Sequence, residues 1–306
     1  MLSALPSPGA HGGDARRVAA ALGIDPAAVL DLSMSLNPMA PDPRPVVAAH
    51  LDALGTYPDP SRATAALAEA IGVDPARLLL TNGGAEAIAL VATDLGVGWA
   101  GEDDFSLYRR HLPVLDPSAP RIRSNPHNPS GRLASPEATA AVWDEAFYPL
   151  ATGRWTRDGD DALVVGSLTK LFACPGLRIG YVLAPDQATI TRLAARQPEW
   201  SVGGLACAAV VDLLATCDLR AWSAGVALLR RELTELLLRH GLEPQPSHAN
   251  YVLCTAAPRL RERLAPHGIV VRDCASFGMV GSARVAVPSA DGLCRLAEAL
   301  EVTAGT

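Results

Sequence analysis

One lysine stands out among the residues that could do chemistry. Lys170 is the only lysine among the 26 basic residues of this 306-residue chain. A guanidinium group keeps its proton at any physiological pH, whereas an amine can lose its proton and attack a carbonyl carbon. Retention of a single lysine therefore favours a chemical role for this amine. The alternative is that one lysine escaped a drifting codon bias.

Hydroxyl and guanidinium groups lie close to this lysine in the sequence. Ser167 and Thr169 follow the apolar run 163–165, and Arg178 comes eight residues after Lys170. A strand that ends in such residues places them at the carboxyl edge of a sheet, where open α/β folds bind ligands. Together they can hold a phosphate while the amine engages a carbonyl group. Alone, the same pattern also fits an ordinary strand end with a solvated charge.

Three further motifs complement this segment. Residues 81–88, Thr-Asn-Gly-Gly-Ala-Glu-Ala-Ile, run from a strand through two glycines into a helix, whose first N–H groups attract anions. The two Asn-Pro steps in 125–131 force a turn, and from it the amide of Asn128 can donate to a phenolate-type oxygen. Asp144 ends an apolar strand, where an ionised carboxylate needs a cationic or N–H partner. Each motif alone also fits a common turn, loop or helix cap.

The four motifs together indicate one ligand, a phosphorylated aromatic aldehyde with a pyridine nitrogen and a ring oxygen. In this order they resemble the fold-type I pyridoxal-phosphate enzymes, the aspartate-aminotransferase-like superfamily, from about His11 onward. The closer resemblance is to the branch of histidinol-phosphate aminotransferase and L-threonine-O-3-phosphate decarboxylase. The residues that carry it are His11-Gly-Gly, Asp31-Leu-Ser-Met-Ser-Leu-Asn37-Pro, Tyr57-Pro-Asp, Asp144-Glu-Ala-Phe and the segment 167–181.

The resemblance assigns roles toward pyridoxal 5'-phosphate. Lys170 would form a Schiff base with the cofactor, and Asp144 would pair with its pyridinium nitrogen. Asn128 would hydrogen-bond the ring oxygen, and Phe105 would stack on the ring. The groups that would hold the phosphate are the backbone N–H groups of Gly84 and Ala85 and the side chains of Ser167, Thr169 and Arg178.

The resemblance also assigns residues to the substrate and to a second subunit. Arg284 would clamp the substrate carboxylate by a two-pronged contact, with a plain surface charge as the alternative. Asn37 would line the substrate pocket, and Tyr57 would reach the cofactor phosphate of a neighbouring subunit, which implies a homodimer. For a phosphate on the substrate itself, the candidates are Arg16, Arg17 and Arg272.

Short apolar runs alternate with turn signals, a pattern typical of an α/β domain with a mainly parallel sheet. The resemblance implies a seven-stranded sheet with helices on both faces. Strands are expected at 78–81, 97–100, 121–124, 140–143, 163–167, 179–183, 249–255, 269–272 and 282–288. Helices are expected at 14–22, 44–54, 61–71, 203–216, 219–240, 258–266 and 290–301. The expected organisation is an N-terminal arm and crossing segment over 1–45, a large cofactor-binding domain over 46–198 and a small α+β domain over 199–306.

Composition excludes several other classes of protein. The chain is 49% hydrophobic and 19% charged, which is typical of a globular protein rather than a disordered one. Its net charge of −6 and lack of basic runs argue against nucleic-acid or anionic-membrane partners. No apolar stretch reaches the roughly 18 residues of a membrane span. The six scattered cysteines suggest neither disulfides nor a metal site, and the start of the chain lacks signal-peptide features, so a cytoplasmic enzyme is expected.

Departures from the family pattern are concentrated in the large domain. The stretches 108–125 and 131–144 are short, and the second has too few residues for its usual helix, so one crossover must be rebuilt. Trp200-Ser-Val-Gly lacks an asparagine that is usual there, and Phe147 stands where many aminotransferases have tyrosine.

The leading prediction is a lyase that decarboxylates L-threonine O-3-phosphate to (R)-1-amino-2-propanol O-2-phosphate in cobalamin biosynthesis. His11-Gly-Gly and Asp144-Glu-Ala-Phe favour this reading. The alternatives are an aminotransferase that acts on histidinol phosphate or a related amino compound, and a catalytically silent scaffold. The bond held perpendicular to the cofactor ring decides between the reactions, and the sequence does not report that angle.

Overall fold

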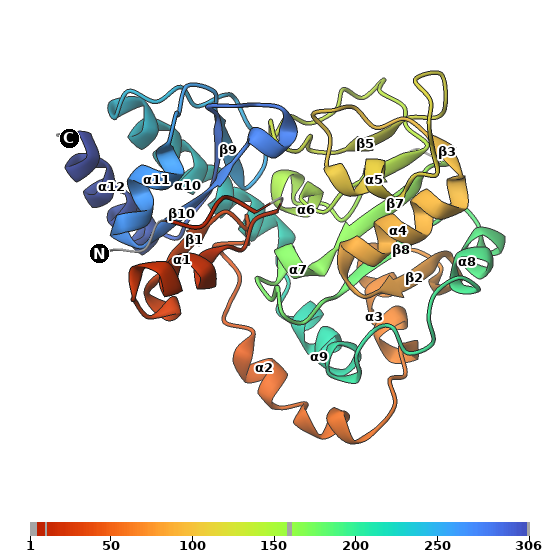
Figure 1. Ribbon diagram of the computed structural model, residues 1–306. Helices are drawn as coiled ribbons and strands as arrows, with labels where there is room; N and C mark the ends of the chain where they lie inside the picture. The colour runs from red at the N-terminus through yellow and green to blue at the C-terminus, as the bar shows by residue number, and fades with distance from the viewer. Residues whose placement is uncertain (1–4, 10, 158–160, 305–306) are drawn as a thin grey trace.

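The larger sheet of the computed structural model has five strands, and the three strands at one edge of it run in alternating directions. The structure describes residues 5–9, 11–157 and 161–304, so positions 1–4 and 10 of the expected arm lie outside it. The strand order is β2 (Leu78–Thr81), β8 (Gly180–Leu183), β7 (Leu163–Ser167), β6 (Val142–Asp144) and β5 (Ile122–Ser124). Strands β5, β6 and β7 are parallel, whereas β8 runs antiparallel to both of its neighbours. We call this part of the molecule the large lobe (Figure 1).

Two short strands continue this sheet beyond β5. Strands β3 (Val97–Gly98) and β4 (Val114–Leu115) pair in parallel, and a parallel bridge between Trp99 and Arg121 joins them to the larger sheet. The expected mainly parallel, seven-stranded sheet is thus present, although its last pair of strands is attached by a single bridge. The solved structures described below confirm the fold class.

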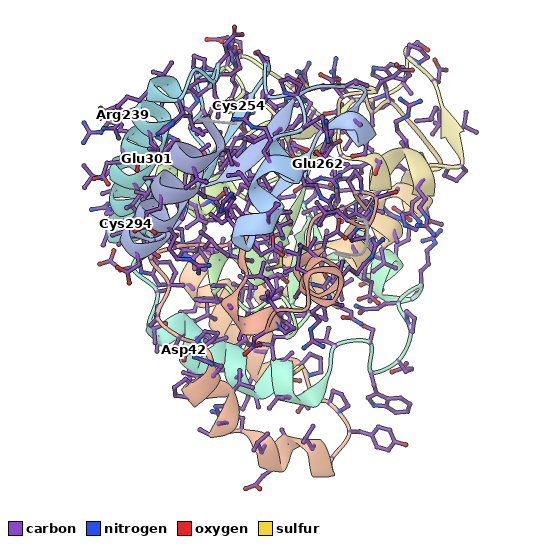
Figure 2. The ribbon with its side chains drawn as sticks, turned by 60° about the vertical axis from the view of Figure 1, so that its left-hand side comes forward. Asp42, Arg239, Cys254, Glu262, Cys294 and Glu301 are labelled. Atoms are coloured by element: carbon purple, nitrogen blue, oxygen red, sulfur yellow. The ribbon has the colours of Figure 1, made fainter. Side chains whose placement is uncertain are left out.

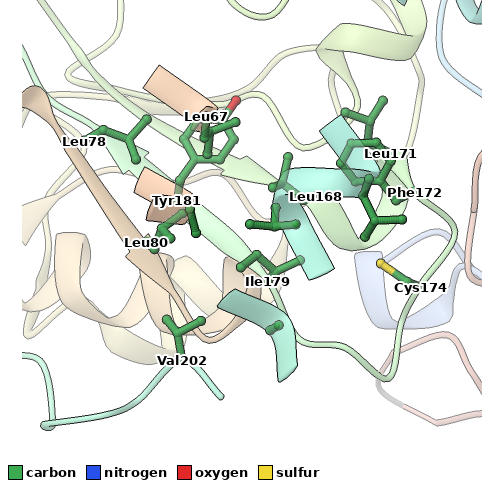
Figure 3. Packing of buried hydrophobic residues seen from close by; sticks show 14 of the residues in the cluster. Leu67, Leu78, Leu80, Leu168, Leu171, Phe172, Cys174, Ile179, Tyr181 and Val202 are labelled. Atoms are coloured by element: carbon green, nitrogen blue, oxygen red, sulfur yellow. The ribbon is translucent and has the colours of Figure 1, made fainter. Parts of the chain in front are cut away.

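Helices cover both faces of the larger sheet. One face carries α4 (Gly83–Leu95), α5 (Ser106–His111) and α8 (Gln187–Ala194) over one buried cluster. The other carries α3 (Ser61–Ile71), α7 (Leu168–Leu171) and α9 (Gly204–Ala215) over a second cluster. Figure 3 shows Leu67, Leu78, Leu80 and Tyr181 meeting in that second cluster. A Cβ at Gly166 would collide with the Tyr181 ring, so glycine is required in the middle of β7.

The small lobe is built on a four-stranded sheet of order β1 (Leu30–Leu32), β10 (Ile269–Asp273), β11 (Ala283–Ala286) and β9 (Tyr251–Cys254). Its helices are α1 (Ala15–Leu22), α10 (Leu219–Arg239), α11 (Leu260–Leu264) and α12 (Ala290–Ala304). Figure 2 shows Cys294 and Glu301 of α12 and Arg239 of α10 on the outer side of this lobe. Because β1 pairs with β10 in parallel, the N-terminal segment is part of the C-terminal sheet.

The segment that follows β1 crosses from the small lobe to the large one and then forms an outlying turn (Figure 1). It contains α2 (Arg44–Ala48) and a 3-10 turn (Leu51–Gly55), which pack on α9. The remaining helical elements are α6 (Tyr148–Thr152) and 3-10 turns at Pro26–Ala28, Pro75–Arg77, Ala265–His267 and Ala275–Phe277. Helix α9 packs against α3 of the large lobe, although its residues fall within the expected small domain. The domain limits therefore stay a prediction.

The shortened connections of the large lobe contain no helix. Residues 116–121 join β4 to β5, and residues 125–141 join β5 to β6. Trp143 of β6 is nonetheless buried, because the guanidinium group of Arg157 lies over its ring at 4.2 Å from the centroid. The same guanidinium donates to the carbonyl oxygen of Pro136 at 3.2 Å. The two loops that Arg157 connects thus cover the sheet. They do so at the place where the sequence has too few residues for the usual crossover helix.

Two negative findings concern the described part of the chain. No helix there combines the length and the apolar character that crossing a bilayer requires. All six cysteines lie in that part, and each is a free thiol.

Candidate active site

A cavity of about 200 Å³ lies at the carboxyl ends of β6 and β7, where residues from both lobes and from the N-terminal segment meet. Of the twelve residues to which the resemblance gives a role toward the cofactor, the substrate carboxylate, the substrate pocket or a second subunit, all but two line it: Gly84, Ala85, Phe105, Asn128, Asp144, Ser167, Thr169, Lys170, Arg178 and Arg284. They come from strand ends, helix starts and turns, as expected for ligand binding at a sheet edge.

Lys170 lies in the short helix α7, directly after β7. Its Nζ atom donates to the carbonyl oxygen of Met34 at 2.9 Å. Burial, together with the positive charges of Arg284 and Arg178, lowers the pKa of Lys170 to about 8, while Asp31 opposes the shift. A lysine with this pKa supplies far more neutral amine near pH 7–8 than an ordinary lysine does, which favours attack on an aldehyde.

Asp144 ends β6 and is buried beneath the cavity. Its carboxylate accepts a hydrogen bond from the N–H of Ala146 at 3.1 Å. Burial raises its pKa to about 6, and the Ala146 N–H and the neighbouring Tyr108 hydroxyl oppose that rise. A carboxylate in this position is stabilised by a cationic ligand group such as a pyridinium N–H.

Asn128 and Arg284 face each other across the two lobes. The guanidinium of Arg284 donates to Oδ1 of Asn128 and, at 3.1 Å, to the carbonyl oxygen of Ser33. Since Oδ1 of Asn128 is engaged, its amide nitrogen is the end that remains to donate to a ligand oxygen. Among the described residues, the Nε atom of Arg284 is buried and lacks a hydrogen-bond partner. A buried donor without a partner is expected where a ligand anion binds.

The opposite end of the cavity is suited to a phosphate. Helix α4 starts there, and the N–H groups of its first turn have no acceptor within the helix. Arg178 lies over this turn, because a Cβ at Gly83 would collide with its guanidinium group. The same guanidinium donates to the Thr169 hydroxyl at 3.5 Å. Both Gly83 and Arg178 have positive φ angles, of 71° and 55°, so the backbone is shaped around this contact.

Phe105 and His11 line another wall of the cavity. Phe105 immediately precedes α5, and the centroids of the two rings lie 5.4 Å apart at an interplanar angle of 58°. Burial and the positive charge of Arg272 lower the pKa of His11, so its neutral form is favoured. Phe105 thus offers an apolar surface to a ligand ring, and His11 offers an uncharged donor or acceptor.

Arg272 was one of three arginines considered for a phosphate on the substrate, and it alone of the three lines the cavity. It is buried, lies with its guanidinium 5.5 Å from the Phe277 ring centroid and donates to Ser276 Oγ at 2.6 Å. Arg16 and Arg17 are exposed on α1, where Arg17 pairs with Asp14 at 3.3 Å.

Two of the residues chosen from the sequence lie outside the cavity wall. Asn37 is buried, and its amide donates to the carbonyl oxygen of Leu171 at 2.9 Å, so it supports the lysine helix from behind. Tyr57 is 77% exposed at the outlying turn and packs on Trp200, with ring centroids 4.6 Å apart. Their roles toward a substrate pocket and a partner subunit stay predictions.

Sequence reasoning missed the contribution of the crossing segment. Ser33 and Met34 line the cavity, and their carbonyl oxygens accept from Arg284 and Lys170. The signal available was the segment 31–38, which was used only for the resemblance. Its backbone role was hidden because carbonyl oxygens are the same for every residue type.

The residues present fit pyridoxal 5'-phosphate. The start of α4 with Arg178 suits a phosphate, the buried carboxylate of Asp144 suits a ring nitrogen, and the same cavity is lined by an amide donor and by an amine of lowered pKa. Positive charge at both ends of the cavity, from Arg178 and from Arg272 with Arg284, suits a phosphorylated cofactor together with an anionic substrate.

Comparison with known families agrees with this geometry. The family model "Aminotransferase class I and II" matches residues 122–300. Histidinol-phosphate aminotransferase 1 of Dechloromonas aromatica is 33% identical over 205 residues, covering 58% of this chain and 55% of that protein. Threonine-phosphate decarboxylase of Salmonella typhimurium is 32% identical over 204 residues, covering 57% of this chain and 55% of that protein. The chain thus spans about half the length of the curated relatives it matches.

A solved structure extends the likeness to nearly the whole chain. The histidinol-phosphate aminotransferase of Sinorhizobium meliloti, in complex with pyridoxal-5'-phosphate, superposes with a TM-score of 0.81. The superposition covers 99% of this chain and 96% of that one at 18% sequence identity. Because the identity is this low, the likeness establishes the fold alone.

Proposed function

The chain belongs to the class I and II aminotransferase family, whose cofactor is pyridoxal 5'-phosphate, and we propose that it is an aminotransferase acting on histidinol phosphate or a related phosphorylated amine. The supporting observation is the pair of cationic ends of one cavity. Arg178 and the start of α4 suit the cofactor phosphate, and Arg272 suits a second phosphate on the substrate. The relatives named histidinol-phosphate aminotransferase favour this reading over the lyase that the sequence analysis placed first.

When bound, pyridoxal phosphate acts as an electron sink for the carbon that carries the amino group. The chain's own residues then position the reacting groups. Asp144 would pair its carboxylate with the ring nitrogen, and Asn128 would donate to the ring oxygen. The Nζ atom of Lys170, with its lowered pKa, can accept and return a proton at the substrate carbon. Phe105 and Phe147 present apolar surface to the cavity.

A second candidate is decarboxylation of L-threonine O-3-phosphate. Two observations favour it: His11 of the His-Gly-Gly segment reaches the cavity beside Phe105, and Phe147 lines the cavity instead of a tyrosine. In this reading Arg284 would give up part of its contact with Asn128 and orient the carboxylate that leaves as CO₂. The likeness to the Salmonella typhimurium decarboxylase gives it further support.

One assay separates the candidates. The cofactor-loaded protein is incubated with histidinol phosphate or with L-threonine O-3-phosphate, each with and without 2-oxoglutarate. Consumption of amine that requires the oxoacid supports the aminotransferase, whereas CO₂ release without an oxoacid supports the decarboxylase. A visible spectrum that neither compound changes would support the silent scaffold and contradict both enzyme readings.

The substrate-phosphate assignment predicts a selective effect of Arg272→Leu. We expect the KM for the phosphorylated amine to rise about a hundredfold, because a buried guanidinium–phosphate contact is lost. The KM for the same amine without phosphate should change little. Arg16→Leu, at an exposed position of α1, is the matched control. Equal losses for both substrates would contradict the assignment.

We further propose a homodimer formed through the outlying turn. Leu51, Leu54, Tyr57 and Trp200 are exposed there by 54%, 72%, 77% and 57%. Tyr57 and Trp200 stack on each other, and large exposed apolar side chains that cluster in this way mark interaction surfaces. The role expected from the resemblance, in which Tyr57 reaches the cofactor phosphate of a second copy, would require a contact between copies.

Leu54→Arg tests the dimer. The buried charge should convert the dimer to a monomer, measured as a halved molar mass by light scattering at micromolar protein concentration. Leu228→Arg, which changes a leucine of similar exposure (52%) on α10, should leave the mass unchanged. Dimers that persist in the Leu54 variant, or monomers in the unmodified protein, would contradict this interface.

A further inference from the structure

His127 occupies the turn between the two Asn-Pro steps and has no role in the site described above. Its side chain is 29% exposed and does not line the cavity. The ring nitrogen Nδ1 lies 2.8 Å from the hydroxyl oxygen of Ser130, inside the same turn. One nitrogen of the ring is therefore used to fix the ring relative to its own loop.

The other ring nitrogen points to a different part of the chain. Nε2 lies 3.5 Å from Oδ1 of Asp104 and 3.6 Å from Oδ2 of Asp103, within ion-pair distance when the ring is protonated. Asp104 is only 5% exposed, and its other oxygen accepts from the N–H of Gly101 at 2.7 Å, so its position is fixed. The next residue is Phe105, which lines the cavity.

The main chain of His127 extends this link to the small lobe. Its carbonyl oxygen accepts from the hydroxyl of Tyr251 at 3.1 Å. The guanidinium of Arg284 lies 4.7 Å from the centroid of the Tyr251 ring, and it also donates to Asn128. His127 thus contacts the segments that carry a ring-stacking residue and a ring-oxygen donor, and it contacts Tyr251, on which an anion-binding arginine packs.

We propose that His127 is a positioning residue. Its imidazole links the 125–131 turn to the 101–105 turn and so fixes the positions of Asn128 and Phe105 relative to the cofactor ring. The inference rests on the proposed function, because it takes Asn128 and Phe105 as contacts of pyridoxal phosphate. Asn128 lies in the shortened segment 125–141, which contains no helix, and Phe105 lies in the turn that directly precedes α5. A side-chain link between the two turns takes the place of such a helix.

Two substitutions separate the linking role from a local role in the turn. Asparagine places a polar atom where Nδ1 of histidine lies, so His127→Asn keeps the Ser130 contact and loses the carboxylates. Glutamine reaches the position of Nε2, so His127→Gln keeps the carboxylates and loses the Ser130 contact. The proposal therefore predicts that the Gln variant binds the cofactor more tightly than the Asn variant. A role confined to the turn predicts the opposite order of the two affinities.

The readouts are the dissociation constant of pyridoxal phosphate and the visible absorption maximum of the loaded protein, together with the melting temperature of the apoprotein. For His127→Asn we expect about tenfold weaker binding and a displaced maximum, since the contact of Nε2 with the two carboxylates, which orients two ring contacts, is lost. His127→Gln should bind within about threefold of the unmodified protein. His111→Asn, at a histidine at the end of α5 that lies outside the cavity wall, is the matched control.

Asp104→Asn provides a second test that leaves the turn itself intact. Combined with His127→Asn, it should add little further loss of binding, because both changes remove the same contact. Equal binding and equal spectra for the Asn and Gln variants, or fully additive losses in the double variant, would overturn the role of His127. If the unmodified protein binds no cofactor, or if Asn128→Ala and Phe105→Ala leave its spectrum unchanged, the proposed site fails first and this inference fails with it.

Discussion

Lys170→Ala is expected to abolish covalent retention of pyridoxal phosphate and to lower turnover by at least about 10³-fold, because no other side chain in this sequence carries a primary amine. The measurement is the intact mass after borohydride reduction. The unmodified protein should gain one reduced cofactor, and the variant should gain none. Absorbance of the free aldehyde should replace that of the bound form in the variant.

Lys170→Arg is the control that separates charge from chemistry. It keeps a positive charge near Met34 but cannot condense with a carbonyl. We expect it to bind the cofactor without covalent retention, because the phosphate cradle and Asp144 are unchanged. A mass gain at another residue in either variant would refute the assignment of Lys170.

Asp144→Asn is expected to have opposite effects on cofactor binding and on the stability of the apoprotein. Binding of pyridoxal phosphate should weaken by about a hundredfold, since the buried partner of the ring nitrogen loses its charge. At pH 8 the apoprotein should melt several degrees higher, because the variant no longer buries an unpaired carboxylate. Titration by absorbance and thermal unfolding without cofactor measure the two effects.

The pH dependence of the apoprotein follows from the same carboxyl group. The pKa of Asp144 is about 6 in the folded protein and 3.8 ordinarily, so the folded chain keeps the proton to higher pH than the unfolded chain does. The free energy of unfolding must then fall as pH rises from about 4 to about 6, by at most roughly 3 kcal/mol from this group, and stay level above that range. Asp144→Asn should remove this part of the slope.

Glu145→Gln is the matched control for this experiment. Burial also raises the pKa of Glu145, to about 7, but its carboxylate faces the backbone N–H of Arg157 and lies outside the cavity wall. We expect this variant to change the pH dependence of stability between about 4.5 and 7 and to leave cofactor binding unchanged. If both variants weakened binding equally, the pairing of Asp144 with the ring nitrogen would be wrong.

Two elements that are bounded by clear turn signals were predicted with the correct first and last residues. Strand β7 was expected at 163–167 and helix α3 at 61–71, and both are observed with those limits. Strand β6 was expected from the apolar run 140–143 with Asp144 at its end; it is observed at Val142–Asp144, where Asp144 pairs with Val165. Apolar patterning records which side chains are buried, whereas strand limits are set by main-chain hydrogen bonds.

The contacts that complete the site could not be predicted in the same way. Strand β1 was missed because it is three residues long and its partner, β10, lies far along the chain. The residues around Lys170 could be predicted, because each motif consists of residues that are close together in the sequence. The Arg284–Asn128 contact and the Lys170–Met34 contact join segments more than 100 residues apart, and no local pattern encodes them.

The position of Lys170 has a practical consequence for handling the protein. Within this sequence the only side chain open to acylation by activated esters or to amide cross-linking through lysine lies at the base of the cavity. Such reagents, used on folded protein, will leave the outer surface unlabelled apart from any chain-terminal amine. A tag, dye or solid support is therefore better attached elsewhere, for example through the exposed thiol of Cys294 on α12.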